Sequence, residues 1–172
     1  MRKTRQAILA LLVPMIMIAA ACGSSDDDST EAADGSGSDT DCATEGTVED
    51  DADSELEVNL AEWSVGVASE TDPGNIELVA NNRGAEAHEL VVVRADSVDE
   101  LTVVDNKVDE SALPDGSFIG EIEEFAAGGT CSGTFALEAG NYILFCNIVE
   151  TEDDGEIESH YEKGMVAMLA VG

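Results

Sequence analysis

The chain has 172 residues, of which 38 are acidic and seven basic, so its formal net charge is −31 at pH 7. A surface this negative repels a phosphate backbone, which excludes nucleic acid as a partner. Two explanations of the charge remain open. Either it steers a basic partner protein, or it keeps the surface solvated, as in salt-adapted proteins. Because the acidic residues are spread over the whole chain, we favour the second.

The first 21 residues predict a secretory signal peptide. Three cations precede an apolar run, which Pro14 interrupts and which is shorter than the roughly 20 apolar residues of a membrane span. The small residues before Cys22 resemble the lipobox of bacterial lipoproteins, which implies a lipid on Cys22 and anchoring to the cell membrane. Secretion without a lipid is the alternative. Cleavage before Cys22 leaves four basic and 38 acidic residues, a formal charge of four minus 38, or −34.

Residues 22–55 predict a flexible acidic linker behind the lipidated cysteine. The stretch from Gly23 to Glu55 carries 13 acidic residues and shows no apolar periodicity. Such a stretch cannot bury enough apolar surface to offset the entropy lost on ordering. The pattern changes at Leu56, and residues 56–172 are numerous enough for one domain with a single core.

Eight short segments of this domain alternate apolar and polar residues or run apolar, as strands do. They are Leu56–Leu60, Trp63–Val67, Asn75–Ala80, His88–Val93, Phe118–Ile122, Thr130–Leu137, Tyr142–Asn147 and Met165–Val171. Residues 105–107 and 138–141 predict tight turns, and residues 96–101 predict one helical turn. The pattern contains no long amphipathic helix. We therefore predict an all-β fold with one core between two sheets.

The two histidines of the sequence, His88 and His160, accompany Cys146 and Met165. One imidazole opens a strand segment, and a thiol, the second imidazole and a thioether follow in that order near the C-terminus. Two imidazoles and a thiolate in a near-trigonal plane, with a weak axial thioether, are the ligands of type 1 copper. Singly, each residue has a plain structural explanation, because buried Cys and Met are ordinary core residues. Together, and in this order, they predict a mononuclear copper site.

Three motifs resemble the cupredoxins, the family of type 1 blue-copper proteins. They are His88-Glu89-Leu90-Val91-Val92, Gly140-Asn141-Tyr142-Ile143-Leu144-Phe145-Cys146-Asn147-Ile148 and His160-Tyr161-Glu162-Lys163-Gly164-Met165. Within the family, the motifs are most similar to the rusticyanin and sulfocyanin-like branch and to related bacterial copper-binding lipoproteins. The resemblance covers roughly residues 56–172. It implies a Greek-key β-sandwich with one mononuclear copper.

The resemblance also implies a role for each site residue. His88, Cys146 and His160 would be the strong copper ligands, and Met165 would be the axial ligand. Tyr142 would pack as a structural corner shortly before the cysteine. The histidine that follows the cysteine lies close to the surface in the family, so His160 would be the edge at which the electron enters.

The spacing between Cys146 and His160 departs from the family pattern. Thirteen residues lie between them, where the family has four, and six of the nine residues from Glu150 to Glu158 are acidic. An insertion whose ends stay close costs on the order of one kcal/mol in loop-closure entropy, which a copper site can tolerate. Because negative charge favours Cu(II) over Cu(I), we expect a lower reduction potential than in a short-loop relative. Binding of a hard cation by residues 153–156 is a weaker alternative, because their register is not that of an EF-hand.

The cysteines leave two disulfide pairings open. A Cys42–Cys131 bond would leave Cys146 as the free thiol that copper requires, and we prefer this pairing. Cys131 and Cys146 also flank the turn at residues 138–141 almost symmetrically, so an antiparallel hairpin could bring them together. A one-residue change of register decides whether they meet. A Cys131–Cys146 bond would remove the thiolate and, with it, the copper site.

These observations predict an extracytoplasmic copper protein, anchored to the membrane through Cys22, that carries electrons by cycling between Cu(I) and Cu(II). We expect a monomer that meets a redox partner protein and that is not an enzyme. No Ser/His/Asp grouping is visible, and a multicopper oxidase needs more than two histidines. Copper storage or delivery is one alternative. A metal-free cupredoxin-like interaction module that uses the long acidic loop is another.

Overall fold

The computed structural model describes residues 42–152 and 154–172. The predicted signal peptide (residues 1–21), the predicted lipidation site Cys22 and the linker up to residue 41 lie outside the described residues. Within the part of the chain that is described, no helix is long and apolar enough to cross a membrane.

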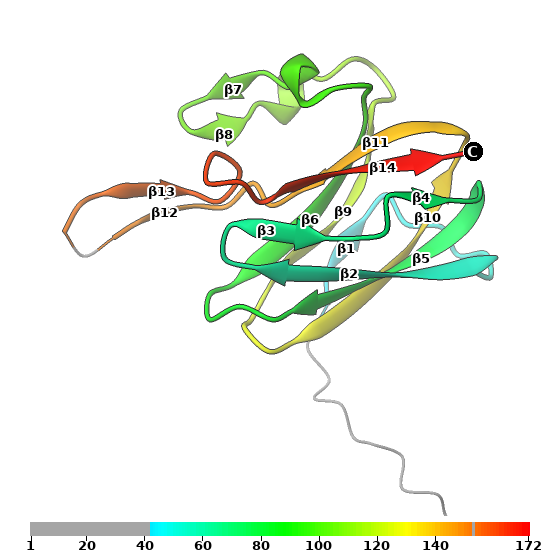
Figure 1. Cartoon of the computed structure of the whole chain (residues 1–172), viewed down its shortest axis with the longest axis horizontal. Helices are drawn as coiled ribbons and strands as arrows, with labels where there is room; N and C mark the ends of the chain where they lie inside the picture. The colour runs from blue at the N-terminus through cyan, green and yellow to red at the C-terminus, as the bar shows by residue number, and fades with distance from the viewer. Residues whose placement is uncertain (1–41, 153) are drawn as a thin grey trace, which may run out of the picture. The chain divides into compact units, whose positions relative to one another are not determined.

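Two β-sheets enclose one core and form a sandwich (Figure 1). The larger sheet runs in the order β1 (Thr44–Glu45), β9 (Phe118–Phe125), β6 (His88–Arg94), β11 (Gly140–Phe145), β14 (Val166–Val171) and β4 (Glu70–Thr71). The smaller sheet runs in the order β10 (Thr130–Leu137), β5 (Gly74–Asn82), β2 (Ser54–Ala61) and β3 (Ser64–Gly66). Neighbouring strands pair antiparallel, except for β2 with β5 and β14 with β4.

Two small hairpins stand outside these sheets. The pair β7 (Val103–Val104) and β8 (Lys107–Val108) closes through Asp105 and Asn106, which both adopt positive φ as a tight hairpin turn requires. The pair β12 (Val149–Thr151) and β13 (Ile157–Ser159) lies between Cys146 and His160. Two single-turn 3-10 helices, η1 (Val98–Glu100) and η2 (Glu110–Ala112), complete the described elements.

The structure confirms the all-β prediction and contains all eight predicted strand segments, as β2, β3, β5, β6, β9, β10, β11 and β14. The other six strands of the described residues are only two or three residues long. Strands this short show no recognisable alternation, so sequence patterning could not find them. The predicted helical turn at residues 96–101 corresponds to η1.

The central strands of the larger sheet are covered on both faces. In β6, Leu90 and Val92 point into the core between the sheets, whereas Val91 and Val93 contact a second apolar cluster on the outer face. Leu101 and Val108 cover that outer face from the segment between β6 and β9. Burial on both faces explains why β6 reads as a continuous apolar run rather than as an alternation.

Tyr142 occupies the corner that the resemblance implied. Its side chain is buried, and its hydroxyl donates a hydrogen bond of 2.8 Å to the carbonyl oxygen of Glu138, at the start of the turn before β11. A tyrosine hydroxyl that bonds to backbone a few residues upstream is a recurrent feature of Greek-key sandwiches. The bond ties the turn to β11, the strand directly before Cys146.

The folded domain begins earlier than the predicted boundary at residue 56. β1 pairs with the edge strand β9, with Thr44 opposite Ile122, and the Val48 amide donates to the Thr134 carbonyl over 2.8 Å. Gly46 permits a close approach, because a Cβ there would lie 2.7 Å from the Cα of Gly120. The prediction of a linker over residues 42–55 is therefore wrong. Pairing at a sheet edge uses backbone groups, so the segment can fold while its acidic side chains stay in water.

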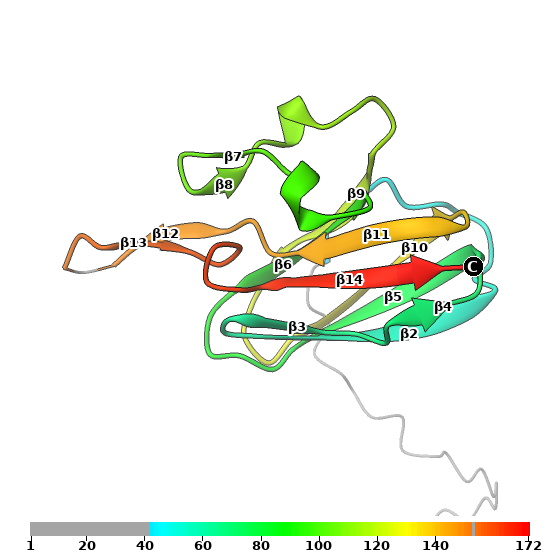
Figure 2. The ribbon, with the colours of Figure 1, turned by 45° about the horizontal axis from the view of Figure 1, so that its top comes forward.

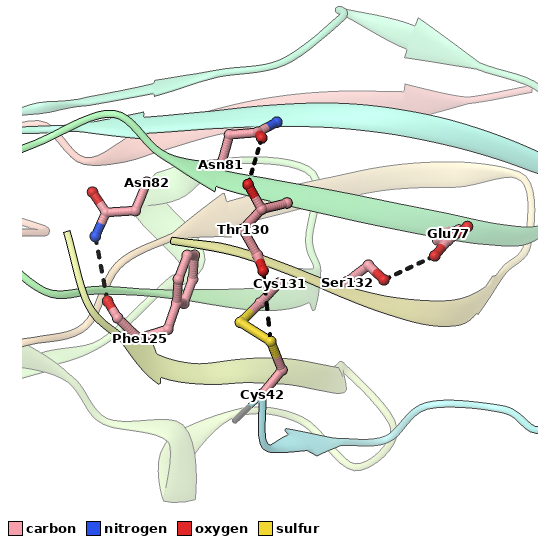
Figure 3. The surroundings of a disulfide bond; sticks show 8 residues. All are labelled: Cys42, Glu77, Asn81, Asn82, Phe125, Thr130, Cys131 and Ser132. Carbon is pink, nitrogen blue, oxygen red and sulfur yellow. Dashed lines mark hydrogen bonds between the residues drawn. A yellow bond between two sulfur atoms is a disulfide. The ribbon is translucent and has the colours of Figure 1, made fainter. Parts of the chain in front are cut away.

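A disulfide bond joins this early segment to the smaller sheet. Cys42 and Cys131 lie 89 residues apart in sequence, with an S–S distance of 2.09 Å and a Cα–Cα distance of 5.6 Å (Figure 3). Cys131 lies in β10, which side-chain hydrogen bonds from Thr130 to Asn81 and from Ser132 to Glu77 tie to β5. The structure thus has the preferred pairing and not the Cys131–Cys146 alternative. Cys146 is the free cysteine of the described residues.

Glu89 brings a carboxyl group into the covered outer face of the larger sheet. One of its oxygens accepts a hydrogen bond of 2.7 Å from the amide of Asn147. Burial raises the pKa of Glu89 from 4.5 to about 7, against the opposing effect of that hydrogen bond, and nearby Glu121 and Glu110 raise it further. The folded protein therefore keeps a proton on Glu89 in mildly acidic solution.

We expect the disulfide to stabilise the domain substantially. Replacing Cys42 and Cys131 together with alanine should lower the free energy of unfolding by about 2 to 5 kcal/mol, because the bond closes a long loop of the unfolded chain. Urea unfolding of the variant and of the disulfide-reduced protein should give the same result. In a Cys146→Ser control, the difference between oxidised and reduced protein should persist. Equal stability of the oxidised and reduced proteins would contradict this assignment.

Glu89 should make the metal-free protein less stable as the pH rises from about 4.5 to about 7. Across this window the folded protein keeps a proton that the unfolded chain has released, so the free energy of unfolding falls with rising pH. The loss attributable to Glu89 is on the order of 2 to 3 kcal/mol. Glu89→Gln should remove it, which urea unfolding of both proteins across the window would measure. His88 and His160 titrate in both proteins and cancel in the difference, so identical pH slopes would refute the prediction.

Candidate metal centre

Three ligand-type side chains reach one place from three segments of the chain. His88 is the first residue of β6, Cys146 follows the last residue of β11, and His160 follows the last residue of β13. The pairing of β6 with β11, in which Val91 lies opposite Phe145, brings the first two segments side by side. All three side chains have 0% exposure to solvent.

The inserted segment folds as a hairpin, and its base keeps Cys146 and His160 close. Val149 pairs with Ser159, and the amide of His160 donates to the carbonyl of Ile148 over 3.0 Å. The hairpin projects away from the sandwich in both ribbon views (Figures 1 and 2). The extra residues therefore extend outward, and the two ligand-type residues sit where the hairpin joins the domain.

Met165 is held next to both of these residues by backbone hydrogen bonds. The Cys146 amide donates to the Met165 carbonyl over 3.1 Å, and the Met165 amide donates to the His160 carbonyl over 2.9 Å. The Met165 side chain is fully buried in the same core as Cys146. The sequence from His160 to Met165 thus forms a tight loop that returns the chain to Cys146 before β14.

The potential donor atoms converge. The Nδ1 atoms of His88 and His160 lie 3.2 Å apart, and the Sγ atom of Cys146 lies 3.3 Å from Nδ1 of His160. All three donor atoms lie within 4.8 Å of one another. Two nitrogens and one sulfur at these separations surround a position where a single metal ion can bind all of them.

Burial keeps the three groups uncharged when no metal is bound. It raises the pKa of the Cys146 thiol to about 12, an effect that hydrogen bonding partly opposes. It also lowers the pKa of His88, with a further contribution from His160, and it lowers the pKa of His160. The imidazoles therefore offer lone pairs at neutral pH. The thiol would lose its proton only to a cation bound beside it, as coordinating thiols do.

The outward nitrogens of the two rings face carboxylates. Nε2 of His88 lies 3.6 Å from Oε1 of Glu62, and Nε2 of His160 lies 3.7 Å from Oε2 of Glu86. Both distances exceed a hydrogen bond. Both Nε2 atoms and Oε2 of Glu86 are buried and have no hydrogen-bond partner among the described residues. No local sequence pattern marks this arrangement, because Glu62 is distant from both histidines along the chain and Glu86 faces His160 rather than its near neighbour His88.

The turn between β2 and β3 covers the outer side of the site. Trp63 lies edge-on to His160, with ring centroids 5.6 Å apart, and Nζ of Lys163 lies 4.4 Å from the centroid of the Trp63 ring. His160 itself has 0% exposure, so its ring presents no solvent-exposed edge, and Trp63 lies beside it.

Asn147 links the site to the segment that covers the outer face of the larger sheet. Its side-chain oxygen accepts the amide of Val108 over 2.7 Å, and its side-chain nitrogen donates to the Val108 carbonyl and to Glu110. With its amide bonded to Glu89, this residue fixes the backbone directly after Cys146. The sequence shows only that Asn147 follows the cysteine. It does not show which residues Asn147 contacts.

The alternative of a hard-cation site at residues 153–156 gains no support. Among the described residues of the hairpin tip, Asp154 accepts the amide of Glu156 through Oδ1 over 2.9 Å, and neither belongs to a cluster able to hold a metal. Asp153 lies outside the described residues.

The residues of the main site fit a soft or borderline metal ion. A thiol and two neutral imidazoles with converging donor atoms suit copper or zinc, whereas hard cations prefer oxygen ligands. Two buried imidazole nitrogens face each other at 3.2 Å beside the thiol, and a cation bound between the three donor atoms would satisfy all of them at once.

Neither models of protein families nor curated proteins match this sequence. Among solved structures, auracyanin B is similar over 76% of this chain and 97% of its own, with 19% identity and a TM-score of 0.55. A dithionite-reduced auracyanin from Roseiflexus castenholzii is similar over 71% of this chain and 99% of its own, with 21% identity and a TM-score of 0.52.

The similarity to the auracyanins extends over nearly their whole length and agrees with the two-sheet sandwich described above. At this level of identity it establishes the fold. The chain therefore has the Greek-key β-sandwich of the cupredoxin fold, as its sequence motifs predicted.

Proposed function

We propose that this chain is a mononuclear copper protein that transfers electrons by cycling between Cu(I) and Cu(II). The observation that carries the proposal is the convergence of the His88 and His160 Nδ1 atoms on the buried Cys146 sulfur. Copper supplies the one-electron chemistry. His88, Cys146 and His160 would be the strong ligands and Met165 the weak axial one, which is the donor set of type 1 copper.

The protein's own contribution would be to hold this donor set still. Strands β6 and β11 position His88 and Cys146, while the backbone bonds among Cys146, His160 and Met165 close the ligand loop. A rigid, dry pocket restricts rearrangement of the ligands when the charge of the metal changes. Full burial of the donors also keeps water from competing for the metal.

The rest of the proposal concerns location and partners. The disulfide between Cys42 and Cys131 supports an extracytoplasmic protein, because such bonds persist in oxidising compartments. We further propose that a lipid on Cys22 anchors the chain to the cell membrane and that a basic redox protein is its partner. Copper storage or delivery is less well supported, because three fully buried donors offer no evident path for metal exchange.

The electron would enter and leave past Trp63 rather than from an exposed edge of His160. Trp63 is half-buried, so its ring contacts both His160 and the surface. It adopts a φ of 68° at a turn position where glycine is usual, a strained conformation for a large side chain. Such strain persists where the surrounding structure or the function of the site maintains it.

Copper binding through Cys146 can be tested by optical spectroscopy. The domain starting at residue 42, loaded with Cu(II), should show an intense visible thiolate-to-copper band, and Cys146→Ser should abolish it. A Cys42→Ala, Cys131→Ala double variant serves as the matched control and should keep the band. Bound copper with only weak absorption would favour storage or delivery. Failure to bind copper would favour the metal-free interaction module.

The proposed role of Trp63 can be tested by electron-exchange kinetics. Trp63→Leu should slow electron self-exchange of the copper-loaded protein several-fold, because it removes the aromatic contact between His160 and the surface. Trp63→Phe should retain most of the rate, and both variants should keep the visible band. An unchanged rate in Trp63→Leu would show that electrons pass elsewhere.

A further inference from the structure

Each of the two proposed histidine ligands has its own carboxylate on the side away from the metal. Glu62 faces His88 at 3.6 Å, and Glu86 faces His160 at 3.7 Å. The two rings meet at 72° with centroids 5.1 Å apart, so their Nδ1 atoms point toward Cys146 while their Nε2 atoms point outward. The acidic pair thus brackets the site from outside.

Backbone hydrogen bonds hold the Glu62 carboxylate in this position. Its Oε1 atom accepts backbone amides from Ala85 at 2.5 Å and Glu86 at 3.0 Å, which fixes the carboxylate above the loop that leads to His88. Gly84 leaves the necessary room, because a Cβ there would lie 2.7 Å from Nε2 of His88 and would collide with the Glu62 carboxylate. Hydrogen bonds from its own amide and from Ala85 lower the pKa of Glu62, so it is ionised at neutral pH.

Glu86 is the counterpart on the other ring. Its Oε2 atom and Nε2 of His160 are both buried, and neither has a hydrogen-bond partner in residues 42–152 and 154–172. The other nearby acid, Glu158, is already occupied by Lys163 through a short ion pair. Leaving a buried carboxylate oxygen and a buried imidazole nitrogen unpaired destabilises the folded state. A hydrogen bond between Glu86 and His160 would satisfy both atoms.

We infer that Glu62 and Glu86 are positioning residues, which accept hydrogen bonds from the Nε2–H groups of His88 and His160 when copper is bound and thereby favour Cu(II) over Cu(I). The inference rests on the proposed function. Binding of a cation at Nδ1 withdraws electron density from the ring, so the Nε2–H group becomes a stronger donor. A closure of roughly 0.7 Å would bring both contacts to the usual N–H···O length.

The two hydrogen bonds would act in two ways. Each fixes a ring with its Nδ1 atom toward Cys146, which is the common role of a carboxylate behind a metal-bound histidine. Each also places a negative charge behind a ligand in a poorly solvated site, where it stabilises the more highly charged metal ion. This predicts that specific charges behind the rings, more than the general acidity of the hairpin, set the reduction potential.

The test compares Glu62→Gln and Glu86→Gln with Glu150→Gln. Glu150 lies in β12, and its charge acts on both histidines, but no hydrogen bond or ion pair of its carboxylate is found in the described structure. Each of the first two variants should weaken Cu(II) binding about tenfold while leaving Cu(I) binding nearly unchanged. That change corresponds to a rise of about 59 mV in the reduction potential. Glu150→Gln should give a clearly smaller rise.

A second measurement separates the hydrogen bond from the charge. In the Cu(I) protein, NMR should show slowly exchanging Nε2 protons on both histidines. The glutamine variants should keep this protection, because the amide oxygen still accepts, whereas Glu62→Ala should lose it at His88 and Glu86→Ala at His160. All variants should keep the visible band of the Cu(II) form, which also reports that they fold.

Three outcomes would overturn the inference. The first is a potential that shifts no more in Glu62→Gln and Glu86→Gln than in Glu150→Gln. The second is protection of the Nε2 protons that survives the alanine substitutions. The third is a second divalent ion, such as Zn²⁺, bound by the copper-loaded protein and lost in Glu86→Gln, because Nε2 of His160 would then be a ligand. A missing band in the unmodified protein would overturn the proposed function as well, so the two failures are distinguishable.

Discussion

Burying two imidazoles and a thiol away from solvent is the constraint on which the rest of this structure depends. Buried polar groups are costly unless they find partners, and here five such atoms gather in one place: the four ring nitrogens of His88 and His160 and the sulfur of Cys146. The two Nε2 atoms have no hydrogen-bond partner among the described residues. The two Nδ1 atoms lie 3.2 Å apart, and the sulfur lies 3.3 Å from Nδ1 of His160. The two Nε2 atoms face carboxylates. A metal at the centre and hydrogen bonds at the rim would satisfy all five.

The long acidic insertion is compatible with that constraint because it is a hairpin. Had residues 147–159 formed an irregular loop, Cys146 and His160 would have been joined by a flexible connection. Because β12 pairs with β13, the chain turns back only at the tip of the hairpin. At its base, Val149 lies opposite Ser159, which keeps the residues next to Cys146 and His160 in a fixed register. Trp63 lies beside His160, and this contact is the basis of the proposed electron route.

Much of the fold was accessible from sequence, because alternation and turn chemistry are local. Neighbouring positions were enough to predict eight of the strands, the hairpin turn at Asp105 and Asn106, and the order of ligand-type residues. Residues 42–55 were misassigned because composition describes side chains, whereas the edge pairing of β1 uses backbone. The contacts of Glu62, Trp63 and Asn147 could not be predicted for a different reason: their partners lie tens of residues away, and no periodic pattern marks such contacts.

The effect of an acidic residue therefore depends on where it lies, and the net charge of the chain alone does not describe the site. Most acidic residues project into water, where salt screens them and where each contributes little to the site. Glu62 and Glu86 differ, because burial of the imidazoles that they face reduces screening. Lys163, one of the few basic residues, lies at the same place, between Glu158 and the ring of Trp63. Adaptation to salt is one explanation of the exposed acids, but it would not explain carboxylates and a lysine placed beside two buried histidines. The positions of these few groups, rather than the overall composition, bear on the proposed function.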